Sequence, residues 1–251
     1  MKQHRFSRTE MLIGTENLNK LKESKILVFG VGGVGSYAVE ALARAGVGKL
    51  RLVDFDDVCL TNCNRQIHAL KNTIGKVKAE VMGERVKLIN PECEVEVVKE
   101  FYTPENGDEL LEGDFHYVID AIDTVSAKLH LIETCVKNNI PIISAMGAGN
   151  KLFPEMLEIA DISQTTICPL ARVVRRELKK RGISKGVEVV YSKEVPRKPI
   201  AYADCKNNCI CPGGDGHCTK KRQIPGSISY VPSVAGLLMA GRVINRIIGV
   251  I

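Results

Sequence analysis

The stretch Lys25-Ile26-Leu27-Val28-Phe29-Gly30-Val31-Gly32-Gly33-Val34-Gly35 decides the fold. It opens with a short apolar run, which is typical of a strand buried on both faces of a parallel sheet. The glycines that follow allow a tight turn, and a helix is expected next, over residues 34–45. Because a helix N-terminus attracts anions, this order of elements predicts a nucleotide site on Gly30, Gly32, Gly33 and Gly35.

Strands and helices alternate along the chain up to about Ala145. Further strands are predicted over residues 49–53, 94–98, 117–120 and 140–144, and helices over residues 75–89 and 124–137. The pattern then changes to two strands over residues 157–162 and 187–192, a basic helix over 169–181, a Cys-rich loop over 195–226 and a last helix over 232–251. This order predicts an α/β fold with a doubly wound, Rossmann-like, mostly parallel sheet and antiparallel C-terminal strands.

The composition excludes several classes of protein. With 251 residues, 45% hydrophobic and 25% charged, the chain is neither disordered nor collagen-like nor a coiled coil. The apolar runs are too short for a transmembrane helix, and Met1 to Arg5 lead into no apolar run, so we expect a cytoplasmic protein without integral membrane association. Aromatic residues make up only 5%, which disfavours a protein that stacks single-stranded bases, whereas the net charge of +6 suits a polyanionic partner.

Three charged residues distinguish between candidate nucleotides. Asp54 ends the second predicted strand, near the offset of about 20 residues at which an acid meets ribose hydroxyls, which fits NAD or ATP. Arg65 and Lys78 precede or open the next predicted helix and suit a triphosphate, whose charge they neutralise. Each residue also has a structural interpretation: Asp54 as a strand-end cap, Arg65 in a surface ion pair, and Lys78 as a solvated helix residue.

Two carboxylates, Asp120 and Asp123, follow the fourth predicted strand. In a doubly wound sheet the carboxyl ends of the strands face the ligand, and a carboxylate beside a triphosphate is a natural Mg²⁺ ligand. The alternatives are that Asp120 caps a turn and that Asp123 is the N-cap of the next helix.

Together these motifs resemble the ThiF/MoeB superfamily, the adenylating relatives of ubiquitin-activating enzymes. The ordered set is Arg5-Phe6-Ser7-Arg8, the glycines of residues 30–35, Asp54-Phe55-Asp56, Asn62-Cys63-Asn64-Arg65-Gln66, Lys78, and residues 120–123. The resemblance implies that ATP converts a carboxylate to an acyl adenylate with release of pyrophosphate. It assigns ATP and Mg²⁺ binding to the glycine loop with Asp54, Asp56, Asn62, Asn64, Arg65, Lys78 and Asp123. It assigns catalysis to Arg8, Arg65, Lys78 and Asp123, with Arg8 reaching the phosphates of the partner subunit in a homodimer.

Within the superfamily the chain is most similar to the tRNA threonylcarbamoyladenosine dehydratases. The stretches that carry this similarity are residues 5–14, 144–151, 162–172, 189–192 and 226–236. The resemblance implies ATP-dependent cyclisation of the threonylcarbamoyl group on the adenosine next to the tRNA anticodon, with loss of water. It also implies one ATP-binding domain over residues 1–251, with a nucleotide-binding core over 1–150 and a substrate and dimer region over 151–251.

Two other functions stay open. One is adenylation of the C-terminal carboxylate of a small sulfur-carrier protein, although the two Cys-x-x-Cys zinc pairs common in such enzymes are missing here. The other is a non-catalytic nucleotide-binding protein in an iron–sulfur or sulfur-trafficking complex, with a sulfur-relay protein as partner. Its sole support is the Cys-rich loop, in which Cys205, Cys209, Cys211 and Cys218 lie beside His217. These thiols could hold Zn²⁺ or an iron–sulfur cluster, but their spacing matches no standard site, and thiols without metal are the alternative.

Two features of residues 168–181 also have two interpretations each. Cys168 is a candidate thioester nucleophile or a structural thiol. Arg172, Arg175, Arg176 and Lys179 share one face of the predicted helix, where they contact tRNA phosphates or are merely solvated. For the last helix we expect Leu237, Ala240, Ile244, Ile247 and Ile251 to form the face that packs on the core or on a partner subunit.

Overall fold

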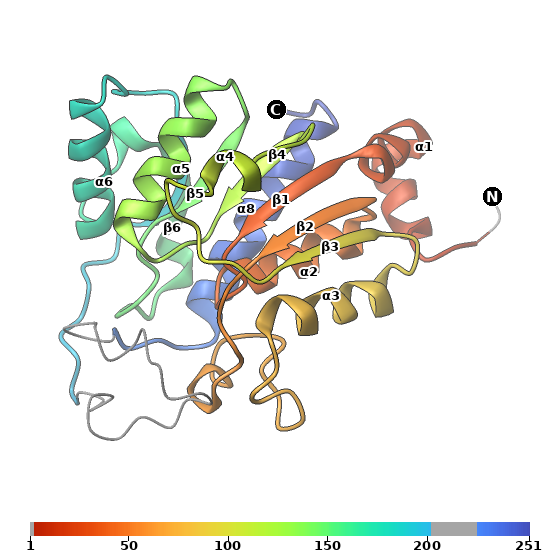
Figure 1. Ribbon diagram of the computed structural model, residues 1–251, viewed down its shortest axis with the longest axis horizontal. Coiled ribbons are helices and arrows are strands. Elements are labelled where there is room, and N and C mark those ends of the chain that lie inside the picture. Colours follow the sequence, from red (N-terminus) through yellow and green to blue (C-terminus); the bar gives the residue numbers. More distant parts are fainter. Residues whose placement is uncertain (1–2, 202–224) are drawn as a thin grey trace.

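The computed structural model describes residues 3–201 and 225–251. Its centre is a seven-stranded sheet in the order β3-β2-β1-β4-β5-β7-β6, covered by helices on both faces (Figure 1). The strands are β1 Lys25–Phe29, β2 Lys49–Val53, β3 Glu94–Val98, β4 Tyr117–Asp120, β5 Ile142–Ala145, β6 Leu157–Asp161 and β7 Glu188–Ser192. The α-helices are α1 Ser7–Glu23, α2 Gly35–Ala45, α3 Lys78–Ile89, α4 Gly107–Leu110, α5 Val125–Lys137, α6 Pro169–Lys180 and α8 Tyr230–Ile247.

The predicted doubly wound topology is confirmed. Neighbouring strands from β3 to β7 are all parallel, with β1 between β2 and β4. The predicted antiparallel pair consists of β6 and β7, which run antiparallel to each other while β7 is parallel to β5. One sheet therefore contains both the five strands within residues 25–145 and the two strands within residues 157–192.

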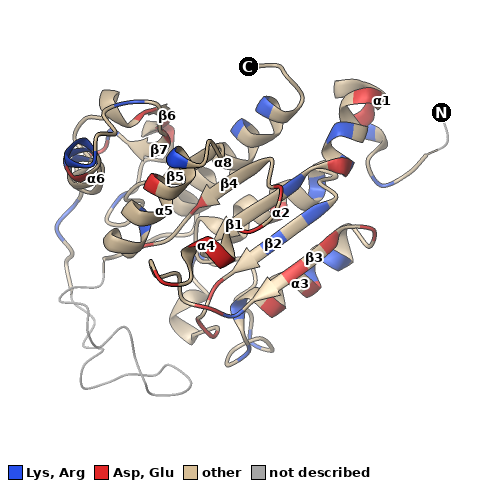
Figure 2. Cartoon of the chain, turned by 45° about the horizontal axis from the view of Figure 1, so that its top comes forward, with Lys and Arg blue, Asp and Glu red and all other residues tan. Residues whose placement is uncertain are grey.

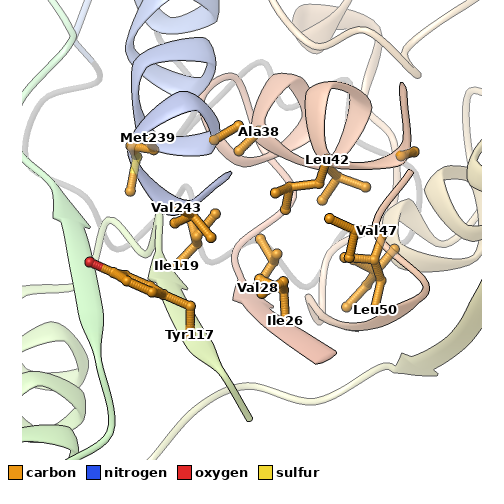
Figure 3. Close-up of a cluster of buried hydrophobic side chains, with 14 of the residues drawn as sticks. Ile26, Val28, Ala38, Leu42, Val47, Leu50, Tyr117, Ile119, Met239 and Val243 are labelled. Carbon is orange, nitrogen blue, oxygen red and sulfur yellow. The ribbon is translucent and has the colours of Figure 1, made fainter. Parts of the chain in front are cut away.

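The alternation of side chains along β1 explains the two hydrophobic layers. Ile26 and Val28 point to the face that α2, α3 and α8 cover, where they pack with Leu42 and Val243 (Figure 3). Leu27 and Phe29 point to the opposite face, which α5 and α6 cover. Each side chain of β1 packs into one of two buried layers. A strand at this central position of the sheet therefore requires a continuous apolar run.

Two of the predicted helices differ from the structure, and α1 and α4 are not among the predicted elements. Helix α3 begins at Lys78 rather than Gly75, because Gly75 turns with φ +86° and Val77 pairs with Asp57 in an isolated bridge. Helix α8 ends at Ile247 and buries Val231, Ala235, Met239 and Val243. Of the predicted inner face, Ala240 is buried, whereas Leu237 is half exposed and Ile251 lies beyond the helix and is also half exposed.

The orientation of α8 follows from a close contact with α2. A Cβ atom on Gly236 would collide with the backbone oxygen of Val34, so the two helix backbones approach as closely as only glycine permits. This contact, rather than the largest apolar residues, decides which face turns inward. Within residues 3–201 and 225–251, no helix is both long and apolar enough to span a bilayer.

Candidate nucleotide-binding site

The glycine loop, residues 30–35, connects β1 to α2 at the carboxyl edge of the sheet. The amide of Gly30 donates to the Val53 oxygen at 2.8 Å, which joins the loop to the end of β2. Gly30 has φ +83°, and a Cβ atom there would lie 2.7 Å from the Ala121 oxygen, while one on Gly35 would collide with the Gly30 oxygen. The glycines are therefore required by close backbone approaches, and the N-terminus of α2 is left facing the edge where a phosphate would bind.

Asp54 fixes the glycine loop from the end of β2. Its Oδ2 accepts from the Val31 amide at 2.7 Å and its Oδ1 accepts from the Asp56 amide at 2.9 Å. Burial raises the pKa of the Asp54 carboxyl, against the opposing effects of the Lys78 charge and these backbone hydrogen bonds. The strand-end cap is thus correct as a structural role, and contact with a ribose stays a prediction.

Lys78 is buried at the first position of α3, with 6% of its surface exposed. Its Nζ lies 2.7 Å from Asp56 Oδ2, and its amide donates to the Asp56 oxygen at 3.0 Å. The interpretation of Lys78 as a solvated helix residue is therefore wrong. The ion pair holds an ammonium group beside Asp54, at the edge where the triphosphate is predicted.

Asn62 and Asn64 shape the segment between β2 and α3. Asn62 is buried, and its Oδ1 accepts from the Cys59 amide at 3.0 Å, which stabilises the 3₁₀ turn Leu60–Asn62. Asn64 is exposed, and its Nδ2 donates to the Ser227 oxygen at 3.0 Å, so it contacts a residue distant in sequence. Both asparagines thus position the neighbouring Arg65.

Arg65 lies along the glycine loop. A Cβ atom on Gly33 would come within 3.3 Å of Arg65 Cγ, and the guanidinium donates to Thr61 O at 3.0 Å and Asn64 Oδ1 at 2.9 Å. Burial lowers the pKa of Arg65, while the charges of Cys59 and Asp123 act in the opposite sense. Arg65 therefore has neutral hydrogen-bond partners together with the charge of Asp123 nearby, and its anion-binding role stays a prediction.

The two carboxylates after β4 have different environments. Asp120 is fully buried: its Oδ2 lies 2.6 Å from Lys128 Nζ and accepts from Ser144 Oγ at 2.5 Å, and its Oδ1 accepts from the Ile122 amide at 3.0 Å. Asp120 therefore caps its turn, as one interpretation held, and is not accessible to a metal ion. Asp123 is exposed and is not the N-cap of α5, because Thr124 occupies that position.

Arg8 is the one predicted catalytic residue that the single chain does not bring to this edge. It is exposed on α1, and α1 lies against the amino ends of the strands, where the Gly48 amide bonds to Leu21 O and the Lys49 amide to Ser24 O. Figure 1 shows α1 at the opposite end of the strands from the loops after β1 and β2. A site completed by Arg8 of a second copy stays a prediction.

A family model described as the ThiF family matches residues 6–250. The chain belongs to the ThiF family. This ThiF-family chain is 48% identical over 248 residues to the tRNA threonylcarbamoyladenosine dehydratase of Bacillus subtilis (strain 168), covering 96% of the chain and 93% of that protein. It is 35% identical over 153 residues to the sulfur carrier protein ThiS adenylyltransferase of Escherichia coli (strain K12), covering 59% of the chain and 60% of that protein.

Among solved structures, the ThiF-family chain is similar to the Escherichia coli tRNA N6-threonylcarbamoyladenosine dehydratase in complex with ATP. The TM-score is 0.84 at 37% identity, covering 98% of this chain and 94% of that chain. The resemblance inferred from sequence motifs is thus confirmed, both for the superfamily and for the group within it.

Sequence reasoning missed Asn150, which has φ +59° in the loop after β5. Its amide donates to Gly226 O at 2.7 Å, its Oδ1 accepts from the Gly226 amide at 2.7 Å, and its oxygen accepts from the Arg197 amide at 2.8 Å. Since Ser227 in turn accepts from Asn64, residues 225–227 connect the loop after β5 to the segment that carries Arg65. The one available signal was the Gly149-Asn150 pair, because asparagine tolerates the left-handed conformation.

The cysteine predictions have different outcomes. Cys168 is buried at the N-cap of α6, and its Sγ would lie 3.7 Å from a Cβ atom added to Gly147. Because the thiol is buried and packed in this way, the structural interpretation of Cys168 is favoured. Cys205, Cys209, Cys211, Cys218 and His217 lie outside the described residues. In the part of the chain that the structure describes, no group of three or more His, Cys, Asp or Glu side chains could hold a metal ion.

Proposed function

We propose that this chain is a tRNA threonylcarbamoyladenosine dehydratase, which adenylates the carboxylate of the threonylcarbamoyl group next to the anticodon and cyclises that group. The observation that carries the proposal is the similarity over nearly the whole length to relatives of that name, one of them solved with ATP. The sulfur-carrier adenylyltransferase covers a much smaller share of the chain at lower identity, and is therefore the weaker alternative.

The chemistry needs activation of a poor electrophile. A free carboxylate does not react with a neighbouring nucleophile because its leaving group would be oxide. Attack of a carboxylate oxygen on the α-phosphorus of ATP forms the mixed anhydride and releases pyrophosphate. A neighbouring atom of the same modification then attacks the acyl carbon, the C–O bond to AMP breaks, and one proton leaves, so that the nucleoside loses one water in total.

The proposed residue roles follow from position and charge. The amides of the glycine loop and the N-terminus of α2 would hold the phosphates, and Arg65 and Lys78 would neutralise charge that develops on them. Asp54 would accept from the ribose hydroxyls, while Asp56 keeps Lys78 in place through the ion pair of 2.7 Å. The main contribution of the protein is therefore orientation and electrostatic stabilisation.

A magnesium ion fits this donor set. Mg²⁺ typically takes one or two carboxylates and completes its shell with phosphate oxygens and water. Asp123 is exposed beside Arg65 and the glycine loop, whereas Asp120 is fully buried, so Asp123 is the residue that would hold the ion. When bound, the ion would draw charge from the phosphates as the pyrophosphate leaves.

A homodimer would supply the remaining arginine. On α1, Met11 and Leu12 are 78% and 86% exposed, about one turn from Arg8. Exposed large apolar side chains together are typical of an interface, so we propose that α1 contacts a second copy and that residues 1–251 act as one unit. Leu12→Asp should give monomers in mass photometry and should lose cyclisation; a dimer of unchanged stability would contradict this arrangement.

One assay tests the function. The purified protein is incubated with ATP, Mg²⁺ and tRNA that carries threonylcarbamoyladenosine, and the products are analysed for pyrophosphate and for a nucleoside lighter by one water. A parallel reaction replaces the tRNA with a carrier protein ending in Gly-Gly. Pyrophosphate with the tRNA alone and the expected mass loss support the dehydratase; an adenylated carrier without any change in the tRNA would contradict it.

A further inference from the structure

Helix α6 carries an unusual concentration of positive charge. Its sequence Pro-Leu-Ala-Arg-Val-Val-Arg-Arg-Glu-Leu-Lys-Lys holds five Lys and Arg residues and one Glu. Ala171, Val174 and Leu178 are buried against the core, so the apolar side of the helix is already covered. Figure 2 shows Lys and Arg over much of α6, which lies at the edge of the molecule.

Local acids do not neutralise this surface. Glu177 accepts from Arg176 at 2.9 Å and from Lys180 at 3.1 Å, so that one carboxylate is shared by two cations. On the neighbouring α5, Glu133 is likewise shared between Lys137 and Arg181, each at 2.7 Å.

Two further cations, Arg172 and Lys179, are exposed and make no ion pair within residues 3–201 and 225–251. Arg175 is partly buried and donates to the neutral Thr165 O and Oγ1, both at 2.5 Å. The predicted face is therefore confirmed for Arg172, Arg176 and Lys179, whereas Arg175 supports the start of the helix.

The helix begins at the edge that holds the nucleotide site. A Cβ atom on Gly147, in the loop after β5, would lie 3.7 Å from Cys168 Sγ and 3.8 Å from Leu170 Cβ. Strand β5 is next to β4, whose carboxyl end leads to Asp123. From there α6 extends over 12 residues, or about 18 Å. The cations of α6 thus form a row that begins near the carboxyl edge of the sheet, where the nucleotide site is, and extends away from it.

We propose that the outer face of α6, defined by Arg172, Arg176, Lys179 and Lys180, binds the phosphate backbone of the tRNA that flanks the modified adenosine. This inference rests on the proposed function, since it names the surface that holds the substrate outside the reacting group. Guanidinium and ammonium groups bind phosphates without reading bases, so the contact sets affinity and salt dependence rather than sequence preference. A membrane is disfavoured because the apolar side of α6 is buried in the core.

The test compares two double variants with the same change in net charge. Arg172→Glu/Lys179→Glu alters α6, and Lys22→Glu/Lys87→Glu alters exposed lysines on α1 and α3. Binding of modified tRNA is measured by fluorescence anisotropy over a series of salt concentrations, together with ATP binding and cyclisation of tRNA and of the isolated modified nucleoside. Size-exclusion chromatography follows the oligomeric state.

We expect the α6 variant to bind tRNA about tenfold more weakly and to lower the slope of log affinity against log salt by about 1.4 to 1.8, the value for two phosphate contacts. Its KM for tRNA should rise, while ATP binding and turnover of the isolated nucleoside stay unchanged. The control variant should change tRNA affinity much less.

Three results would overturn the inference: equal loss in both variants, an unchanged salt slope, or a change of oligomeric state confined to the α6 variant, which would make this face a protein interface. If the wild-type protein binds tRNA through α6 but never removes water from the nucleoside, the proposed function fails while the binding surface stands.

Discussion

Replacement of Lys128 by methionine tests how the edge of the nucleotide site is held. Lys128 and Asp120 form an ion pair of 2.6 Å in which both side chains are 0% exposed. Lys128→Met keeps most of the aliphatic side chain but leaves the Asp120 carboxylate buried without a counter-charge. Removal of one partner from a buried pair costs about 3–5 kcal/mol, and the total stability of a folded domain is about 5–15 kcal/mol. We therefore expect a large loss of stability from this single change.

The assay is equilibrium unfolding in urea, with two comparison variants. Lys137→Met, on the same helix, removes a lysine that is 68% exposed and paired with Glu133, so it should cost less than about 0.5 kcal/mol. The double variant Lys128→Met/Asp120→Asn removes the uncompensated charge and should be more stable than Lys128→Met alone. A loss below about 1 kcal/mol for Lys128→Met, or a double variant that is less stable than the single one, would refute the reasoning.

The same variant carries a functional prediction. Asp120 Oδ1 accepts from the Ile122 amide at 3.0 Å, and Ile122 directly precedes Asp123. When Asp120 loses Lys128, this turn loses its fixed partner, and Asp123 is no longer held beside Arg65. The Kd for ATP·Mg²⁺ should therefore rise in Lys128→Met and stay unchanged in Lys137→Met, measured by calorimetry at a temperature where both variants are folded.

Three further predictions concern the site and its surroundings. Arg65→Ala and Lys78→Ala should each lower cyclisation about 100-fold or more while circular dichroism stays native, because each removes a charge that is proposed to neutralise the phosphates. Near-normal turnover would contradict the site, and Lys87→Ala, distant on α3, is the control. Gly35→Ala should abolish ATP binding, because its Cβ collides with Gly30 O, whereas Gly241→Ala, where the added Cβ meets open space, should leave binding intact; equal binding by both would refute the loop geometry. Burial lowers the pKa of His68 from 6.5 to about 4, so His68 of the unfolded chain binds a proton at a higher pH than His68 of the folded chain. The free energy of unfolding should therefore fall by up to about 3 kcal/mol as the pH drops from about 6.5 to 4. His68→Gln should flatten this part of the stability profile, and a profile identical to that of the wild type would rule out the assignment.

Local signals made the nucleotide edge predictable from sequence. The apolar run of β1 and the glycines after it are adjacent in the chain, and the hydrogen bonds that fix them, such as Val31 N to Asp54 Oδ2, follow from the order of strands. Strands β1, β4 and β5 could be predicted because a strand buried on both faces requires consecutive apolar residues, whereas β2 and β3 alternate charged and apolar residues. Arg65 and Lys78 could be identified because both belong to short motifs beside predicted element ends.

Contacts between distant residues explain what the sequence could not reveal. Asp120 and Asp123 have the same residue type and nearly the same position, but Asp120 is buried by Lys128 and Ser144, which come from α5 and β5. The inner face of α8 depends on the contact of Gly236 with Val34, which hydrophobic spacing does not encode. Helix α1 was missed because its apolar residues are divided between a buried side at Leu18 and Leu21 and exposed positions at Met11 and Leu12.

The hydrogen bonds of Asn150 have a consequence for how this protein can diversify. Because Asn150 bonds to both Arg197 and Gly226, these two points of the chain are held together, beside the segment that carries Arg65. Lengthening a connection whose ends are already joined costs little entropy and transmits little strain. Residues added between Arg197 and Gly226 should therefore change the free energy of unfolding little, as long as Asn150 keeps its hydrogen bonds to both.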